Sequence, residues 1–139
     1  MGGFYLDEML KSDKWEVAYI CDTDPGARDF ARQKSPGSRV VSDEREVFED
    51  PEVQVVGLFT LADSRLRQIR EAVARGKHIM SEKPVADTIE REWEAVRRVE
   101  ESQSLGTVNL YLRSSWYHNA IQEFIRRGEI GELAIIRVC

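Results

Sequence analysis

Short apolar runs alternate with longer amphipathic segments along the whole chain. Every residue of the run Val55-Val56-Gly57-Leu58-Phe59 is apolar, as is typical of strands that are covered on both faces. This alternation favours a mostly parallel sheet with helices on both sides. We therefore predict strands over residues 15–21, 39–41, 53–59, 78–81, 107–112 and 133–138.

Helix start and stop signals mark the ends of the amphipathic segments. Residues 4–10 have an apolar pattern with helical spacing. Further along the chain, Asp24 is placed to cap a helix that begins at Pro25. A longer helix ends at Gly76, because glycine adopts the left-handed conformation that other residues resist. The apolar stripe of that longer helix consists of Leu66, Ile69 and Val73.

A fourth amphipathic segment begins at Asp87 or Thr88, where Asp87 and Glu90 have the spacing of a capping box. Its apolar residues recur at helical spacing and are predicted to face the core. They are Ile89, Trp93, Val96 and Val99. A last helix is predicted near residues 117–127, ending at Gly128.

The composition narrows the class of protein. With 139 residues, 42% of them apolar, the chain has the length of one domain with a buried core. Its 20 basic and 25 acidic residues give a net charge of −5 and form no basic block, so we expect no nucleic-acid partner. No apolar run approaches the roughly 18 to 20 residues that cross a bilayer, and the start lacks a signal-peptide layout. We therefore expect a cytoplasmic protein with no membrane partner.

The two cysteines, Cys21 and Cys139, lie far apart, with no nearby Cys/His cluster. Neither a disulfide framework nor a metal site is expected from this spacing.

The start of the chain indicates part of a dinucleotide site. Such sites begin with a strand and a glycine-rich turn at a helix N-terminus, whereas Met1-Gly2-Gly3 has no strand before it. If Gly2 ends that turn, the acidic residue for the adenosine ribose belongs roughly 20 residues later, where Asp22 follows an apolar run. A carboxylate there would repel a 2′-phosphate, which favours NAD over NADP. The alternatives are a flexible Gly-Gly terminus and an Asp22 that only caps a helix.

The run from Ala74 to Pro84, ARGKHIMSEKP, resembles the Gfo/Idh/MocA oxidoreductase family, in which a Gly-Lys-His-Val strand leads into Glu-Lys-Pro. Further matches follow the family's order at Met1-Gly2, residues 21–25, residues 52–56 and residues 128–133. The resemblance implies a Rossmann-type doubly wound parallel sheet that lacks its first strand, with the start of a second α+β domain. Residues 1–115 would be the NAD(P)-binding domain, and residues 116–139 the connecting helix and first strand of the second domain.

The resemblance also implies an NAD(P)-dependent dehydrogenase acting on a sugar, polyol or related hydroxy compound. Lys83 would be catalytic, because an ammonium can polarise the oxygen of the group that is oxidised or reduced. The cofactor would contact Gly2, Asp22, Thr60, Glu82, Pro84 and Arg113. The full-length form is expected to be a homo-oligomer, and the 139-residue chain to be inactive alone.

Two departures from the family pattern follow Thr60, which itself matches. Leu61 replaces the usual proline, and Arg65 replaces an imidazole with a permanent cation. His78 is interpreted as structural.

Two other classes remain open at this point. One is a non-catalytic relative of the same fold that senses a dinucleotide or a sugar. The other is a different Rossmann-type domain, such as a binder of nucleotide sugars or S-adenosylmethionine. The run Glu82-Lys83-Pro84 argues against the second class, although alone it could be an exposed loop.

Overall fold

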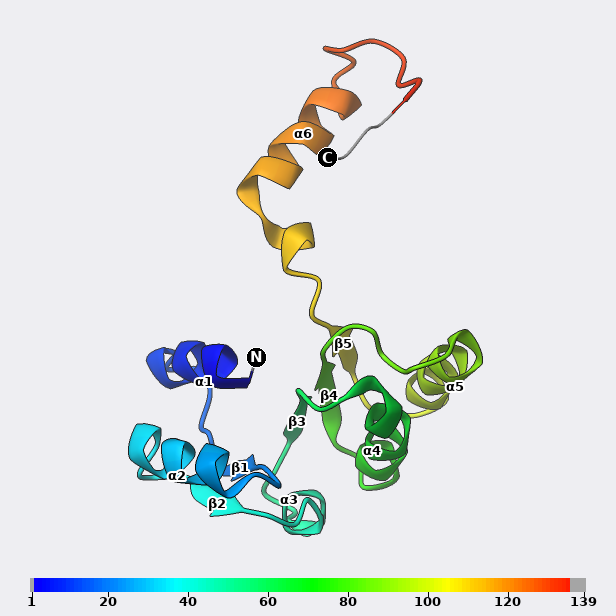
Figure 1. The fold of residues 1–139 in the computed structure, drawn as a ribbon. Helices are drawn as coiled ribbons and strands as arrows, with labels where there is room; N and C mark the ends of the chain where they lie inside the picture. Colours follow the sequence, from blue (N-terminus) through cyan, green and yellow to red (C-terminus); the bar gives the residue numbers. More distant parts are fainter. Residues whose placement is uncertain (1, 136–139) are drawn as a thin grey trace. The chain divides into compact units, whose positions relative to one another are not determined.

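The computed structural model describes residues 2–135 and divides into two compact units, Met1–Val108 and Asn109–Cys139. Each unit is described separately. In the first unit, helices and strands alternate along the chain (Figure 1). They are α1 (Gly2–Lys11), β1 (Tyr19–Cys21), α2 (Pro25–Lys34), β2 (Arg39–Val41), α3 (Arg45–Glu49), β3 (Val55–Leu58), α4 (Ala62–Ala74), β4 (His78–Ser81), α5 (Ile89–Glu100) and β5 (Gly106–Val108).

All strand pairs of the first unit are parallel, which confirms the predicted α/β class. One sheet pairs β1 with β2, and the other has the order β3-β4-β5. In the Rossmann strand order 3-2-1-4-5-6, these two sheets correspond to strands 3-2 and strands 4-5-6. In the described part of the chain, no strand is paired between β1 and β3, which is the place of the first Rossmann strand.

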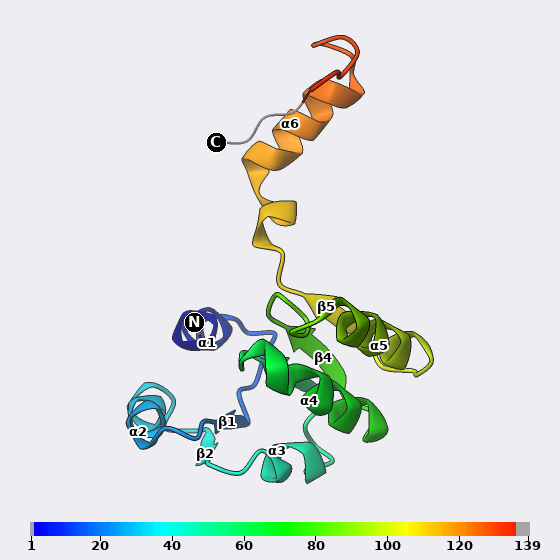
Figure 2. The ribbon, with the colours of Figure 1, turned by 45° about the vertical axis from the view of Figure 1, so that its right-hand side comes forward.

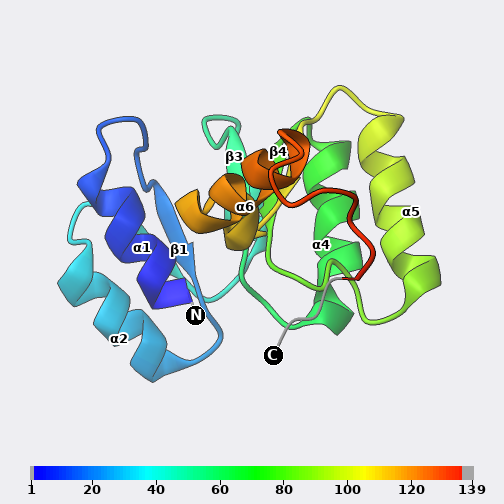
Figure 3. The same cartoon turned by 90° about the horizontal axis from the view of Figure 1, so that it is seen from above.

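The hydrophobic core lies where α4 packs on β3 and β4, and α5 lies beside α4 (Figure 2). The view from above shows α4 and α5 running side by side (Figure 3). Leu66 and Ile69 from the predicted stripe of α4 are each 2% exposed, and Val73 packs against the same cluster. The other buried members are Phe48, Val56, Leu58, Ala72, Ile79 and Ala95. The predicted stripe of α4 is therefore confirmed.

The predicted helix ends are largely confirmed. The Asp24 side chain accepts a hydrogen bond from the backbone N–H of Ala27, and Pro25 is the first residue of α2. Gly76 follows α4 with a φ of 69°, and Gly128 follows the last helix with a φ of 72°. The structural role of His78 also holds, since its Nδ1 accepts a hydrogen bond of 3.0 Å from the backbone N–H of Leu105.

The strands predicted over residues 39–41 and 78–81 are confirmed as β2 and β4, whereas other predicted strands are longer than the observed ones. Residues 15–18 lie outside β1, and residues 53, 54 and 59 lie outside β3. The strand predicted over residues 107–112 is wrong beyond Val108, because Leu110 turns the backbone at φ −118° and ψ 67° into a 3-10 helix, η1 (Tyr111–Ser114). The short helix α3 was not predicted, since its five residues are too few to show a helical period.

The predicted buried face of α5 is wrong in three of its four residues. Ile89 is 63% exposed, Trp93 60% and Val96 39%, whereas Val99 packs against the core. The helix instead buries Ala95, a small residue that lets α5 lie close to α4. The orientation of α5 therefore directs its bulkiest apolar side chains away from the core of this unit.

The start of α5 also differs from the predicted capping box. The Thr88 hydroxyl caps the helix by accepting a hydrogen bond of 3.4 Å from the N–H of Arg91. Asp87 forms an ion pair of 2.6 Å with Arg91 instead of capping the helix.

The second unit contains η1 and the helix α6 (Trp116–Arg126). The predicted helix near residues 117–127 is thus confirmed. Residues 133–135 form no strand, and the remainder of the strand predicted over residues 133–138 lies outside the described residues. Across residues 2–135, no helix is both long and apolar enough to cross a membrane. In that same part of the chain, no three His, Cys, Asp or Glu side chains gather to hold a metal ion.

Candidate cofactor and catalytic site

Two segments that carry predicted site residues meet at the carboxyl edge of the sheet β3-β4-β5. Thr60 follows β3, and Glu82-Lys83-Pro84 follow β4. Because β3 and β4 are parallel and pair Leu58 with Ser81, both segments leave the sheet at the same edge. The backbone N–H of Glu82 donates to the carbonyl of Leu58 at 3.0 Å, which continues the ladder by one step. In open α/β sheets, ligands bind outside this edge.

Glu82 is a buried carboxylate with anchoring hydrogen bonds. It is 2% exposed, its Oε1 accepts from the Tyr5 hydroxyl at 2.7 Å, and its Oε2 accepts from the backbone N–H of Lys83 at 3.0 Å. Burial raises the pKa of Glu82, but these two hydrogen bonds and the charges of Lys83 and Arg65 lower it below its ordinary value overall. Glu82 is therefore ionised at neutral pH and holds its own turn in place.

Tyr5 connects α1 to this edge. The hydrogen bond to Glu82, aided by burial, raises the pKa of Tyr5 to about 12, so its hydroxyl stays protonated and donates. Its ring stacks on Phe59, with ring centroids 4.6 Å apart and an interplanar angle of 13°. Gly2 begins this same helix. The N-terminal helix is thus fixed to the ends of β3 and β4 by a contact between residues 77 positions apart.

Lys83 and Pro84 differ from Glu82 in being exposed. The peptide bond between them is cis. Lys83 is an exposed cationic residue that follows a buried, hydrogen-bonded carboxylate in the chain. Lys83 is open to solvent at the edge where β3 and β4 end.

The Thr60 hydroxyl has a defined hydrogen-bonding role. It donates to Oε1 of Gln68 at 2.5 Å, and Nε2 of the buried Gln68 donates to Glu44 at 2.7 Å. A hydroxyl has one hydrogen, so Thr60 can only accept a further hydrogen bond from a ligand.

Arg65 belongs to the same edge, although the sequence indicated it only as a departure from the family pattern. Arg65 is buried, with 6% of its surface exposed. Its guanidinium donates to the backbone carbonyls of Thr60, Glu82 and Pro84. Arg65 belongs to the buried face of α4, together with Leu66 and the polar Gln68.

Asp22 lies at the carboxyl end of β1, in the other sheet. Its Oδ1 accepts from the backbone N–H of Asp24 at 2.9 Å, and the Arg28 guanidinium donates to the Asp22 carbonyl at 2.8 Å. Desolvation and then the charges of Glu44, Asp22, Asp43 and Glu46 raise the pKa of the neighbouring Cys21 thiol. The surroundings of Asp22 therefore contain several carboxylates together with the Arg28 guanidinium.

Arg113, the remaining predicted site residue, lies in η1 of the second unit, and its contact with a cofactor stays a prediction.

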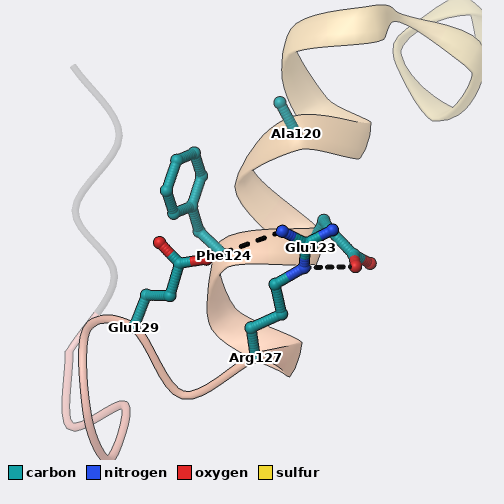
Figure 4. A pocket seen from close by; sticks show the side chains of 5 residues that line it. All are labelled: Ala120, Glu123, Phe124, Arg127 and Glu129. Atoms are coloured by element: carbon teal, nitrogen blue, oxygen red, sulfur yellow. Dashed lines mark hydrogen bonds and ion pairs between the residues drawn. The ribbon is translucent and has the colours of Figure 1, made fainter.

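That unit has a surface hollow of about 150 Å³ beside α6 (Figure 4). Its lining residues are Ala120, Glu123, Phe124, Arg127 and Glu129. Glu123 pairs with Arg127 at 2.7 Å, and Arg127 lies 3.8 Å from Glu129. The hollow contains none of the predicted site residues.

The fold and the arrangement at the strand ends define a Rossmann-type dinucleotide-binding domain. A family model described as an oxidoreductase family with an NAD-binding Rossmann fold, GFO_IDH_MocA, matches residues 1–110. The chain belongs to this family, which confirms the resemblance found in the sequence.

Curated relatives agree with this assignment. The chain is 33% identical over 109 residues to a 1,5-anhydro-D-fructose reductase of Ensifer adhaerens, a match that covers 78% of this chain and 32% of the relative. It is 28% identical over 101 residues to an inositol 2-dehydrogenase of Rhodococcus jostii, covering 72% and 28%. The chain thus matches about a third of the length of these relatives.

A solved structure shows the same fold. The crystal structure of scyllo-inositol dehydrogenase from Lactobacillus casei, with bound NAD(H) and scyllo-inositol, superposes with a TM-score of 0.86 at 20% identity. The match covers 94% of this chain and 39% of that protein.

Proposed function

We propose that the protein containing this chain transfers a hydride between NAD and the carbon of a hydroxyl or carbonyl group in a sugar, a polyol or a related compound. The observation that carries the proposal is the exposed Lys83 ammonium at the same sheet edge as Thr60, with Glu82 buried beside it. The names of the relatives, a sugar reductase and an inositol dehydrogenase, support this substrate class.

The residues present fit NAD. Asp22 follows β1, where a carboxylate accepts hydrogen bonds from ribose hydroxyls, and the negative charge of that carboxylate disfavours a 2′-phosphate. The first turn of α1 contains no acidic residue that would repel a pyrophosphate. Thr60 offers a hydrogen-bond acceptor at the opposite end of the site. When bound, NAD supplies the carbon that accepts or donates the hydride.

Lys83 is proposed to stabilise charge on the substrate oxygen. During oxidation, the C–H bond breaks as the hydride leaves, the hydroxyl proton passes to solvent water, and negative charge develops on the oxygen until the carbonyl bond forms. A hydrogen bond from the Lys83 ammonium lowers the energy of that charge, and the same bond polarises a carbonyl during reduction. Glu82 accepts from the Lys83 backbone N–H and thereby fixes the start of the Lys83 side chain. Glu82 is assigned to anchoring and not to proton transfer.

The test requires the protein with the sequence encoded on either side of residues 1–139, because the chain alone is expected to show no turnover. NADH and NADPH binding is measured by fluorescence titration, and turnover by NADH absorbance on a panel of sugars and inositols. We expect tighter binding of NADH than of NADPH, and turnover of at least one compound. NADH binding without any turnover would favour a sensing role, and absence of dinucleotide binding would overturn the proposal.

A further inference from the structure

Arg65 is a buried cation to which the proposed chemistry gives no role. It lies in the first turn of α4, next to the core residue Leu66, and is 6% exposed. Arginine is almost never fully buried unless it has partners. Within the described residues, its Nε has no hydrogen-bond partner, so the partners of its two terminal nitrogens account for its position.

Those partners are three backbone carbonyls from two separate segments. Nη1 donates to the Glu82 carbonyl at 3.1 Å and also to the Pro84 carbonyl, and Nη2 donates to the Thr60 carbonyl. A guanidinium presents its donors in a fixed plane, so one side chain can hold several acceptors in a set geometry. The segment after β3 and the segment after β4 are therefore joined by a single side chain.

The joined segments are the two that carry the proposed site. Two of the carbonyls flank Lys83 in the sequence, and the third belongs to Thr60. A shift of either segment would change the distance between the Lys83 ammonium and a ligand held at Thr60. Because Arg65 is buried, it acts through these backbone groups and not on a ligand directly.

We propose that Arg65 is a positioning residue that sets the place of Lys83 relative to Thr60. This inference rests on the proposed function for its effect on rate. Its geometric part stands on the three carbonyl contacts alone. Lysine at this position would keep the charge but lacks the planar donors needed to reach both segments.

The first test is a double-mutant cycle on turnover in the protein with its flanking sequence. Arg65→Met is expected to lower kcat roughly 10- to 100-fold with little change in the KM for NAD, because small displacements of reacting groups have effects of this size. In a Lys83→Met background, the same change is expected to alter kcat less than about twofold, since the two residues act as a unit. Equal effects in both backgrounds would contradict the proposal.

Arg70→Met is the matched control, because Arg70 lies on the same helix but is half exposed and pairs with Glu94. It should leave kcat unchanged. Arg65→Lys provides a second variant in case Arg65→Met does not fold, and it is expected to change kcat in the same direction. Wild-type kcat in Arg65→Lys would show that charge alone suffices and would overturn the bridging role.

The second test does not depend on turnover. The backbone N–H of Lys83 donates to Glu82, and that of Val85 donates to Glu92, so hydrogen exchange at these two amides reports on the segment after β4. Loss of the Arg65 contacts should speed exchange at both amides and leave that of Ile79 in β4 unchanged. Unchanged exchange at Lys83 and Val85, or faster exchange throughout α4 and β4, would overturn the proposal. If the wild-type protein binds NADH without turnover, the proposed function fails while this test still decides the role of Arg65.

Discussion

The two sheets of the first unit are held in different ways. The sheet β3-β4-β5 packs on α4, and its carboxyl edge is fixed by buried polar groups, Glu82 and Arg65. Every residue of β1 and β2 is half-buried or exposed, and Asp22 lies in an exposed turn. The positions of the residues proposed for hydride transfer are thus fixed by buried contacts, whereas the position of the residue proposed to bind the ribose is fixed by hydrogen bonds at the surface.

This difference has a functional meaning. Geometry matters most where bonds form and break, because catalysis depends on small differences in distance and orientation. Selection between two cofactors needs only a charge of the right sign at the ribose. Changes in the sheet β3-β4-β5 should therefore affect stability or rate, and changes near β1 should affect the choice of cofactor.

The largest expected effect on stability comes from the core of the better-packed sheet. Ile69→Ala is expected to lower the free energy of unfolding by roughly 2 to 5 kcal/mol, because Ile69 is 2% exposed and leaves a cavity. Ile89→Ala makes the same chemical change at a residue that is 63% exposed, and should stay within about 0.5 kcal/mol of wild type. Urea denaturation of both variants checks this, and equal losses would show that the α5 face is buried after all.

The next effect concerns cofactor choice. Asp22→Asn is expected to shift the ratio of Kd values for NADH and NADPH roughly 10- to 100-fold toward NADPH, since hydrogen bonds to a charged group contribute about 1.5 to 3 kcal/mol. Fluorescence titration with both dinucleotides gives the ratio. Asp24→Asn is the matched control, because asparagine also caps a helix and should leave the ratio unchanged. A shift in both variants would point to general charge and not to a ribose contact.

A smaller effect is expected where α1 meets the sheet β3-β4-β5. Tyr5→Phe keeps the ring that stacks on Phe59 and removes the hydrogen bond to Glu82, which should cost roughly 1.5 kcal/mol at neutral pH. The pKa of Glu82 is lowered on folding, so the stability from its ionised form is present above its ordinary pKa and is lost as the pH falls through the lowered value. The difference between wild type and Tyr5→Phe should therefore shrink in acid. Denaturation at several pH values measures it, and a constant difference would rule out the link to Glu82 ionisation.

The smallest effect is expected at a surface ion pair between α4 and α5. Arg70→Met removes the pair with Glu94 and should lower the free energy of unfolding by about 0.2 to 1 kcal/mol, because both side chains are partly exposed. The loss should diminish in high salt. A loss as large as that of Ile69→Ala would mean that this pair supports the core.

Sequence patterns predicted the first unit best where local signals and packing agree. The stripe of α4 and the cap at Asp24 follow from residue spacing alone, and both are observed. The α5 face shows the limit of periodicity. An apolar stripe at Ile89 and Trp93 indicates a face that favours burial, but it does not say which neighbour covers it. In this unit, Ala95 makes the close contact with the core instead.

The residues of the motif and the strand ends, the buried Glu82 among them, were predicted from the sequence, whereas Tyr5 was missed and Arg65 was seen only as a departure from the family pattern. Asp22 and Lys83 stand at strand ends, where motif and spacing point to a ligand. Arg65 and Tyr5 act through contacts with residues far away in sequence, and such pairings depend on strand order and register, which a single sequence does not reveal. Residues that support a site only through such distant pairings are for this reason the least predictable.

The central claim is that Lys83 acts on the reacting oxygen at the well-packed edge. The direct measurement is kcat of Lys83→Met in the protein with its flanking sequence, beside Lys14→Met, which alters an exposed lysine remote from the strand ends in sequence. We predict a loss of roughly 10²- to 10⁴-fold for Lys83→Met with unchanged NADH binding, and wild-type kcat for Lys14→Met. Wild-type kcat in Lys83→Met would contradict the account.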